Sequence, residues 1–191
     1  MKPQCRTLAR TAVFFGGVVP ASPDEERLAE EVGMALAGAG FTLLHGGYNG
    51  LMEACARGAA SKGGMVTAVT LADKHQEWGD FNPYVTDEVH LPDLGARLNH
   101  YLGHADLVVV MAGGVGTLHE LTAAIYYAGN IRPVPVWITG TTALGLLTFL
   151  RRERWLLETP TRPLEFLSPI ASAAAFAAQL RDLTDKKEAD A

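Results

Sequence analysis

Short runs of consecutive apolar residues alternate with amphipathic segments along most of the chain. The apolar runs predict buried strands at residues 11–16, 41–44, 65–71, 84–90, 106–111 and 133–139. Helical periodicity predicts helices at residues 23–39 and 51–62, after Asp93, after Gly116, and at residues 143–156 and 172–183. Fully apolar strands joined by helices are typical of a parallel sheet covered on both faces. The pattern therefore predicts an α/β fold, a Rossmann-like doubly wound parallel sheet with helices on both faces.

The alternation occupies residues 11–184, which we expect to form one domain. A chain of 191 residues is long enough for a single α/β domain with a full core. Residues 1–10 are expected to be an N-terminal extension, and the charged residues 185–191 a disordered tail. Residues 72–83, which include Trp78 and Phe81, interrupt the rhythm. Two interpretations of this segment stay open: a loop beside a ligand opening, or a long connection without a binding role.

The first helix carries a start signal. Ser22-Pro-Asp-Glu25 offers an N-cap serine, a proline at the first helical position and an acid in the place that a capping box requires. Gly40 is expected to end this helix.

Composition narrows the classes of function. The formal net charge is −5 and no run of Lys and Arg is present, which argues against a nucleic-acid surface. Cys5 and Cys55 lack the spacing of a metal site, so no metal and a reducing cytoplasm are expected. The basic start followed by residues 12–20 could mimic a secretory signal, but that apolar run is short and broken by glycine. No stretch approaches the roughly 20 apolar residues of a membrane span, so a soluble protein without a membrane partner is expected.

The most informative segment is Met111-Ala-Gly-Gly-Val-Gly-Thr-Leu-His-Glu120. It follows an apolar strand and opens a helix, and its glycines allow the backbone to approach an anion at the positive end of that helix. Glu120 lies about one turn inside the helix. A carboxylate does not bind phosphate, so Glu120 suggests chemistry on the group that the phosphate anchors. A purely structural turn is the alternative, because the segment is neither a dinucleotide fingerprint nor a P-loop.

Three glycine-rich turns are expected at the same edge of the sheet. They are Gly16-Gly17, Gly46 to Gly50 and Gly113 to Thr117, and each follows a predicted strand. Ligands of open parallel sheets bind beyond the carboxyl ends of the strands, where the strand order reverses. A purely structural role would explain a single glycine-rich turn, but not three of them at the same edge. The sequence therefore predicts a nucleotide pocket at this edge.

The segment from Met111 to Glu120 resembles the P-G-G-x-G-T-x-x-E signature of the LOG family, whose characterised members are cytokinin riboside 5′-monophosphate phosphoribohydrolases. The segment Gly46-Gly-Tyr-Asn-Gly-Leu-Met-Glu-Ala54 is similar to that family's G-G-G-x-G-[IL]-M-E-A segment. Arg97 is similar to the arginine that the LOG family places on the helix before its P-G-G-x-G-T-x-x-E signature. The chain departs from the family at three positions: Tyr48 replaces a third glycine, Ala112 replaces the proline, and Leu98 follows Arg97 where plant-type members carry Arg-Lys.

The resemblance implies hydrolysis of the N-glycosidic bond of a nucleoside 5′-monophosphate, either AMP or an N6-modified AMP, to the free base and ribose 5-phosphate. It implies catalytic roles for Arg97 and Glu120, no cofactor, and a homodimer or higher homo-oligomer. The expected phosphate- and nucleotide-binding residues are Gly16, Gly46, Gly47, Gly50, Glu53, Gly113, Gly114, Val115, Gly116 and Thr117.

A different class of function stays open. Related folds include a molybdenum-cofactor carrier and nucleotide sensors, so the chain could bind such a ligand without turning it over. Without the resemblance, Arg97 would be interpreted as a solvated or salt-bridged side chain and Glu120 as a favourable acid near a helix start. His45 could line the pocket or be packed in the core. Amino-acid decarboxylation is disfavoured, because Lys62 and Lys74 lie in no recognisable pyridoxal-phosphate context.

Overall fold

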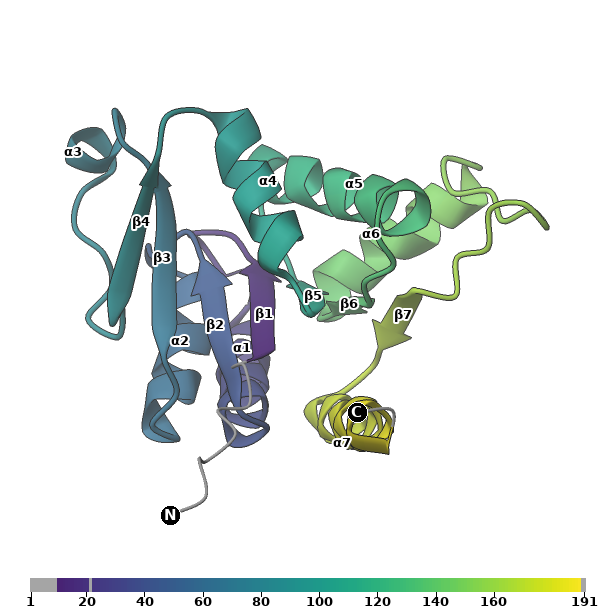
Figure 1. The fold of residues 1–191 in the computed structure, drawn as a ribbon, viewed down its shortest axis with the longest axis horizontal. Coiled ribbons are helices and arrows are strands. Elements are labelled where there is room, and N and C mark those ends of the chain that lie inside the picture. The colour runs from purple at the N-terminus through teal and green to yellow at the C-terminus, as the bar shows by residue number, and fades with distance from the viewer. Residues whose placement is uncertain (1–9, 21, 190–191) are drawn as a thin grey trace, which may run out of the picture.

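The computed structural model describes residues 10–20 and 22–189, which fold around one seven-stranded sheet (Figure 1). All neighbouring strands are parallel, in the order β4-β3-β2-β1-β5-β6-β7. The strands are β1 Arg10–Phe15, β2 Phe41–His45, β3 Val66–Leu71, β4 Asp87–Leu91, β5 Leu107–Val110, β6 Val136–Thr139 and β7 Leu167–Ile170. The helices are α1 Pro23–Gly38, α2 Leu51–Ser61, α3 His75–Trp78, α4 Leu94–His104, α5 Val115–Asn130, α6 Thr141–Arg152 and α7 Ala173–Ala189.

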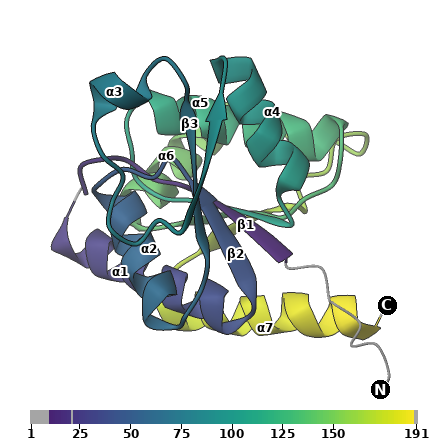
Figure 2. The ribbon, with the colours of Figure 1, turned by 60° about the vertical axis from the view of Figure 1, so that its left-hand side comes forward.

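Helices cover both faces of the sheet, as the sequence predicts. One core layer joins the sheet to α1, α2 and α7, and the other joins it to α4, α5 and α6 (Figures 1 and 2). Alternate residues of one strand face the two layers: Phe14 belongs to the first core and Phe15 to the second. The prediction of a single Rossmann-like α/β domain is confirmed.

Several details differ from the sequence predictions. β7 was not expected, because Leu-Ser-Pro-Ile is short and contains a proline. The four-residue helix α3 lies inside the segment expected to be a loop. α7 continues to Ala189, so residues 185–189 extend the helix past the expected end of the domain. Of the proposed N-terminal extension, residues 1–9 lie outside the described residues, and Arg10 begins β1.

The predicted N-cap is confirmed, but the capping-box acid acts elsewhere. Ser22 Oγ accepts a hydrogen bond from the backbone N–H of Glu25 at 3.2 Å. The buried carboxylate of Glu25 reaches across to α6, where Oε1 accepts from the N–H of Thr142 at 2.7 Å. The N-cap residue of α6 is Gly140, which has no side chain to cap the helix, so a side chain of α1 supplies the cap.

Glycines let α1 and α2 touch backbone to backbone. A Cβ atom at Gly33 would lie 1.9 Å from the carbonyl oxygen of Cys55, and one at Gly58 would lie 1.9 Å from that of Glu30. Arg57 closes the same contact with an ion pair to Glu30 at 2.9 Å. This packing sets how α2, and therefore the turn before it, is held against the sheet.

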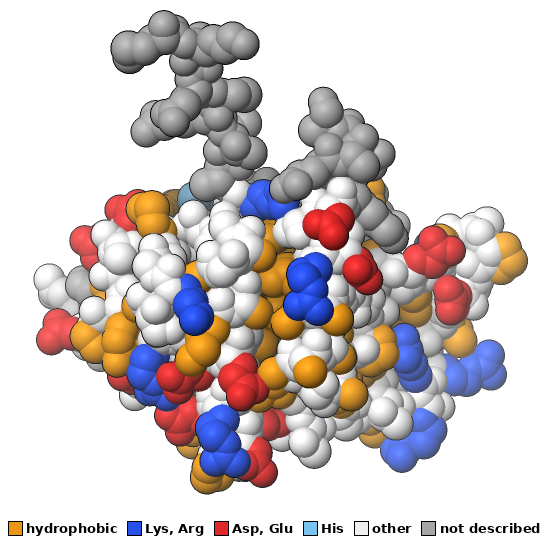
Figure 3. All heavy atoms as spheres, turned by 90° about the horizontal axis from the view of Figure 1, so that it is seen from below, with side chains coloured by type: hydrophobic (Ala, Val, Ile, Leu, Met, Phe, Trp, Pro, Cys, Tyr) orange, Lys and Arg blue, Asp and Glu red, His pale blue; other side chains and the backbone are white. Residues whose placement is uncertain are grey.

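The surface shows mixed charge. On the described part of the face in Figure 3, which lies at the bottom of Figure 1, basic and acidic side chains are interspersed among apolar ones. Among the described helices, none is both long and apolar enough to cross a membrane.

The α1–α2 contact gives a stability prediction. Gly58→Ala is expected to lower the free energy of unfolding by about 1–3 kcal/mol or more, because its methyl group would overlap a rigid carbonyl. Gly145→Ala is the matched control, since a methyl group at that exposed position in α6 meets nothing within 4 Å. Denaturant unfolding measures both. Equal stability of the two variants would contradict the described packing.

Candidate nucleotide site

A cleft of about 750 Å³ lies at the carboxyl ends of the central strands. The chain builds the sheet outward from β1 in one direction through β2 and in the other from β5, so β1 and β5 flank the point where the strand order reverses. The cleft is lined by Gly16, Gly17, Val18, Tyr48, Asn49, Met52, Glu53, Trp78, Asp80, Phe81, Asn82, Arg97, Gly114, Gly116, Thr117 and Glu120.

Backbone contacts join the three glycine turns into one rim. The N–H of Gly17 donates to the carbonyl of Ala112 at 2.8 Å, and the N–H of Leu51 donates to the carbonyl of Gly17 at 3.0 Å. A Cβ atom at Gly17 would lie 2.7 Å from the Cα of Gly113, so these two turns pack without space for side chains. Gly50 has φ +71°, and a Cβ there would lie 2.2 Å from the carbonyl oxygen of Val18. Glycine is therefore required at these positions for packing.

The start of α5 faces the cleft with free space in front of it. Gly114 is the N-cap and provides no side-chain hydrogen bond to the first turn. A Cβ atom at Gly114 or at Gly116 would meet nothing within 4 Å, although both residues line the cleft. Thr117 adds a hydroxyl to the same wall. Uncapped N–H groups at the positive end of a helix favour an anion, phosphate above all.

Arg97 is tied to β3. Its Nε donates to the carbonyl of Val69 at 3.0 Å, and its Nη2 lies 3.3 Å from the hydroxyl of Tyr101. That hydroxyl also donates to the carbonyl of Val69, at 3.0 Å. Gly46 leaves room for the guanidinium, because a Cβ there would lie 3.0 Å from Nη2. These contacts hold the guanidinium of α4 at the cleft.

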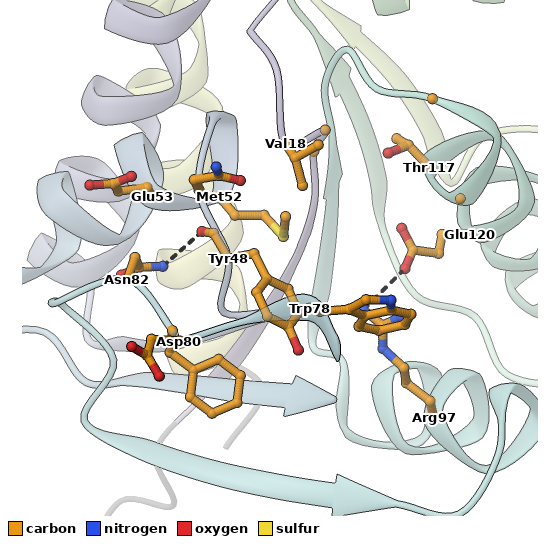
Figure 4. A pocket seen from close by; sticks show the side chains of 16 residues that line it. Val18, Tyr48, Met52, Glu53, Trp78, Asp80, Asn82, Arg97, Thr117 and Glu120 are labelled. Atoms are coloured by element: carbon orange, nitrogen blue, oxygen red, sulfur yellow. Dashed lines mark hydrogen bonds and ion pairs between the residues drawn. The ribbon is translucent and has the colours of Figure 1, made fainter. Parts of the chain in front are cut away.

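Glu120 of α5 is the partner of Arg97. Oε1 of Glu120 lies 3.9 Å from Nη2 of Arg97, and their side chains are 17% and 15% exposed (Figure 4). The separation is longer than a hydrogen bond, so each group keeps hydrogen-bonding capacity for a ligand.

The pair is strongly affected by burial. Desolvation raises the pKa of the Glu120 carboxyl to about 7, although the positive charge of Arg97 opposes the shift. Burial lowers the pKa of Arg97, but Tyr101 and Glu120 raise it by more, so the guanidinium stays charged. A carboxyl that changes protonation state near neutral pH is suited to general acid–base work.

His45 is a packed histidine and does not line the cleft. Its Nδ1 accepts a hydrogen bond from the N–H of Gly47 at 2.8 Å, which places the imidazole proton on Nε2. Complete burial lowers the pKa of His45 to about 3, so the ring is neutral. The neutral ring holds the turn at Gly47, where φ is +86°.

The structure brings only part of the expected set to the cleft wall. Arg97, Glu120, Gly16, Glu53, Gly114, Gly116 and Thr117 line it. Gly46, Gly47, Gly50, Gly113 and Val115 are not among its lining residues. The four glycines shape the turns behind the wall, and the side chain of Val115 is exposed to solvent.

Residues from the segment 72–83 also line the cleft, which fits the interpretation of a loop beside a ligand opening. Trp78, Asp80 and Phe81 lie there with Asn82. The side-chain amide of Asn82 donates to the carbonyls of Gly47 and Tyr48 at 2.9 and 3.0 Å, tying this segment to the turn at Gly46 to Gly50 (Figure 4). No sequence motif marks Asn82 for this role.

Comparison with known proteins places the chain in a family. A model of the SLOG cluster4 family matches residues 11–142. The chain belongs to the SLOG cluster4 family. It is 39% identical over 130 residues to an uncharacterised protein of Archaeoglobus fulgidus, which covers 65% of this chain and 83% of that protein. It is 33% identical over 113 residues to the cytokinin riboside 5′-monophosphate phosphoribohydrolase of Mycobacterium tuberculosis, covering 58% of this chain and 59% of that enzyme.

Solved structures agree on the fold. The molybdenum cofactor binding protein of Rippkaea orientalis has a TM-score of 0.71 at 21% identity, covering 93% of this chain and 98% of that one. The molybdenum cofactor carrier protein of Chlamydomonas reinhardtii has a TM-score of 0.70 at 20% identity, covering 92% and 98%. At these identities the likeness extends to the fold alone. The LOG resemblance is supported by the sequence comparison as a distant homology, at 33% identity to the Mycobacterium tuberculosis enzyme.

The raised pKa of Glu120 predicts a pH-dependent stability. The folded protein holds this proton up to about pH 7, whereas the unfolded chain releases it near 4.5, so stability falls as pH rises through this window. Glu120→Gln removes the cost of the buried charge. It is expected to gain on the order of 1–3 kcal/mol over the unsubstituted protein at pH 8, with the gain shrinking towards pH 5.

Denaturant unfolding at several pH values measures this difference. Glu31→Gln, at an exposed position of α1, controls for the change in net charge. A gain that does not depend on pH would show that Glu120 titrates as an ordinary carboxyl.

Proposed function

We propose that the protein hydrolyses the N-glycosidic bond of a nucleoside 5′-monophosphate, AMP or an N6-modified AMP, to free base and ribose 5-phosphate. The observation that carries this proposal is the Arg97–Glu120 pair, partly buried beside the uncapped start of α5. A phosphate site alone would need no carboxylate. A carboxylate and a fixed cation that line the same cleft as that site suit chemistry on the sugar.

Each group has a physical role in the proposed reaction. The N–H groups of α5 and the Thr117 hydroxyl hold the 5′-phosphate. Arg97 binds ribose or phosphate oxygens with its planar, charged fork. Ionised Glu120 stabilises the positive charge that develops on the ribose or orients the attacking water. Water adds its oxygen to C1′, the C1′–N bond breaks, and the bonding pair leaves with the base, which takes up a proton.

The named activity of the Mycobacterium tuberculosis relative supports this reaction, since that enzyme is a phosphoribohydrolase of a nucleoside 5′-monophosphate. The second candidate is binding without turnover. It is favoured by the likeness to molybdenum cofactor binding and carrier proteins over nearly their whole length. For either candidate we place an anionic group of the ligand at the uncapped start of α5.

We also propose that the protein forms a homodimer or a higher homo-oligomer. Apolar side chains stay exposed along α5 and α6, among them Leu118, Tyr126 and Phe149. A groove of about 310 Å³ lined by Tyr126, Trp155 and Leu157 continues this surface. Large exposed apolar surfaces mark association sites, and a second copy of the chain would cover this one. Light scattering after gel filtration measures the oligomeric state.

The proposed reaction predicts that the protein releases the base from AMP or N6-isopentenyl AMP. Chromatography of the free base and of ribose 5-phosphate measures this release. Glu120→Gln is expected to lower the rate by about 10²- to 10⁴-fold while nucleotide binding is kept, because it removes the carboxylate charge and little volume. Glu31→Gln is expected to keep full activity. Tight binding of AMP with no base release by the unsubstituted protein would contradict hydrolysis and favour the carrier function.

A further inference from the structure

An aromatic corner lines part of the cleft. Trp78 of α3 packs edge-on against Tyr48, with ring centroids 5.7 Å apart and an interplanar angle of 82°. Phe81 packs on the same tyrosine at 5.5 Å. All three residues line the cleft, and neither glycine motif predicts them as a group.

Tyr48 is a fixed wall of this corner. Its side chain is buried, and its hydroxyl is 2.7 Å from Oγ1 of the buried Thr70. Its backbone carbonyl accepts from the side-chain amide of Asn82. The hydroxyl hydrogen bond and the two ring contacts hold the Tyr48 ring, and the Asn82 bond holds its backbone.

Trp78 differs from Tyr48 because it is 42% exposed. Trp137, by contrast, is buried in the core, where its ring centroid lies 5.1 Å from that of Phe176. Trp78 instead presents indole surface to the cleft, on a helix of four residues that ends before Gly79, whose φ is +85°. Exposed aromatic surface in a cleft favours stacking with a planar ligand.

The order of the side chains across the cleft suits a mononucleotide. Figure 4 shows Glu120 between Trp78 and Thr117, with Arg97 beside it. A ligand with its phosphate at Thr117 and its sugar at Glu120 would extend its third part towards Trp78.

We propose that Trp78, backed by Tyr48, binds the planar heterocycle of the phosphorylated ligand and determines the preference of the site for it. This inference rests on the proposed function for the position of the phosphate. It does not require hydrolysis, because stacking contributes to binding whether or not the bond to the heterocycle breaks.

The test compares two ligands in the Glu120→Gln protein, where turnover is suppressed. Calorimetry measures the Kd of AMP, which carries a heterocycle, and of ribose 5-phosphate, which does not. Adding Trp78→Ala is expected to weaken AMP binding about tenfold, the size of one base–aromatic stacking contact, and to leave the Kd of ribose 5-phosphate unchanged. Adding Trp78→Phe is expected to restore most of the AMP affinity.

Indole fluorescence provides an independent readout that a folding defect would not imitate. AMP is expected to quench the emission of the protein, and Trp78→Phe is expected to abolish this change, whereas Trp155→Phe, at an exposed position outside the cleft lining, keeps it. Equal weakening of both ligands by Trp78→Ala, no weakening of either, or quenching that persists in Trp78→Phe would overturn the inference. Absence of base release by the unsubstituted protein would overturn the proposed function and not the heterocycle subsite.

Discussion

The contact between the turns after β1 and β5 is the constraint on which the site depends. Gly17 and Gly113 meet backbone to backbone, and the hydrogen bond from Gly17 to Ala112 fixes their relative position. A side chain at Gly17 would push the turns apart, and one at Gly113 would collide with Thr117 at the start of α5. Thr117 and Glu120 are placed by that start, one at the helix end and one a turn inside it. The close packing of small residues therefore sets the geometry of the polar groups.

Burial supplies the chemical character of the site. The N-terminal end of α5 attracts an anion, while desolvation holds Glu120 on the border between its two protonation states. Arg97 limits that shift and is itself fixed by Val69 and Tyr101. A ligand that displaces water from the cleft would strengthen each of these interactions. The proposed phosphate binding and the proposed sugar chemistry are thus linked through one helix.

Much of the fold is predictable from the sequence because a parallel sheet imprints a local pattern. The runs that became β1, β2, β3 and β5 are mostly apolar, and glycine turns follow several of them. β7 could not be predicted, because a strand of four residues that includes a proline shows no periodic hydrophobic pattern. The sequence around Glu25 predicts a local capping acid. Its hydrogen bond with Thr142 joins residues 117 positions apart, and no local sequence pattern predicts such a contact. The wall formed by Tyr48, Trp78 and Asn82 depends on the same kind of long-range packing.

The pH dependence of base release from AMP tests the central claim most directly, that Glu120 acts as an ionised, partly buried carboxylate beside Arg97. If Glu120 acts in this way, kcat rises with pH and levels off with an apparent pKa of about 7. The residual activity of Glu120→Gln should lack this limb. A profile whose acidic limb lies near 4.5, or one that the substitution leaves unchanged, would contradict the account.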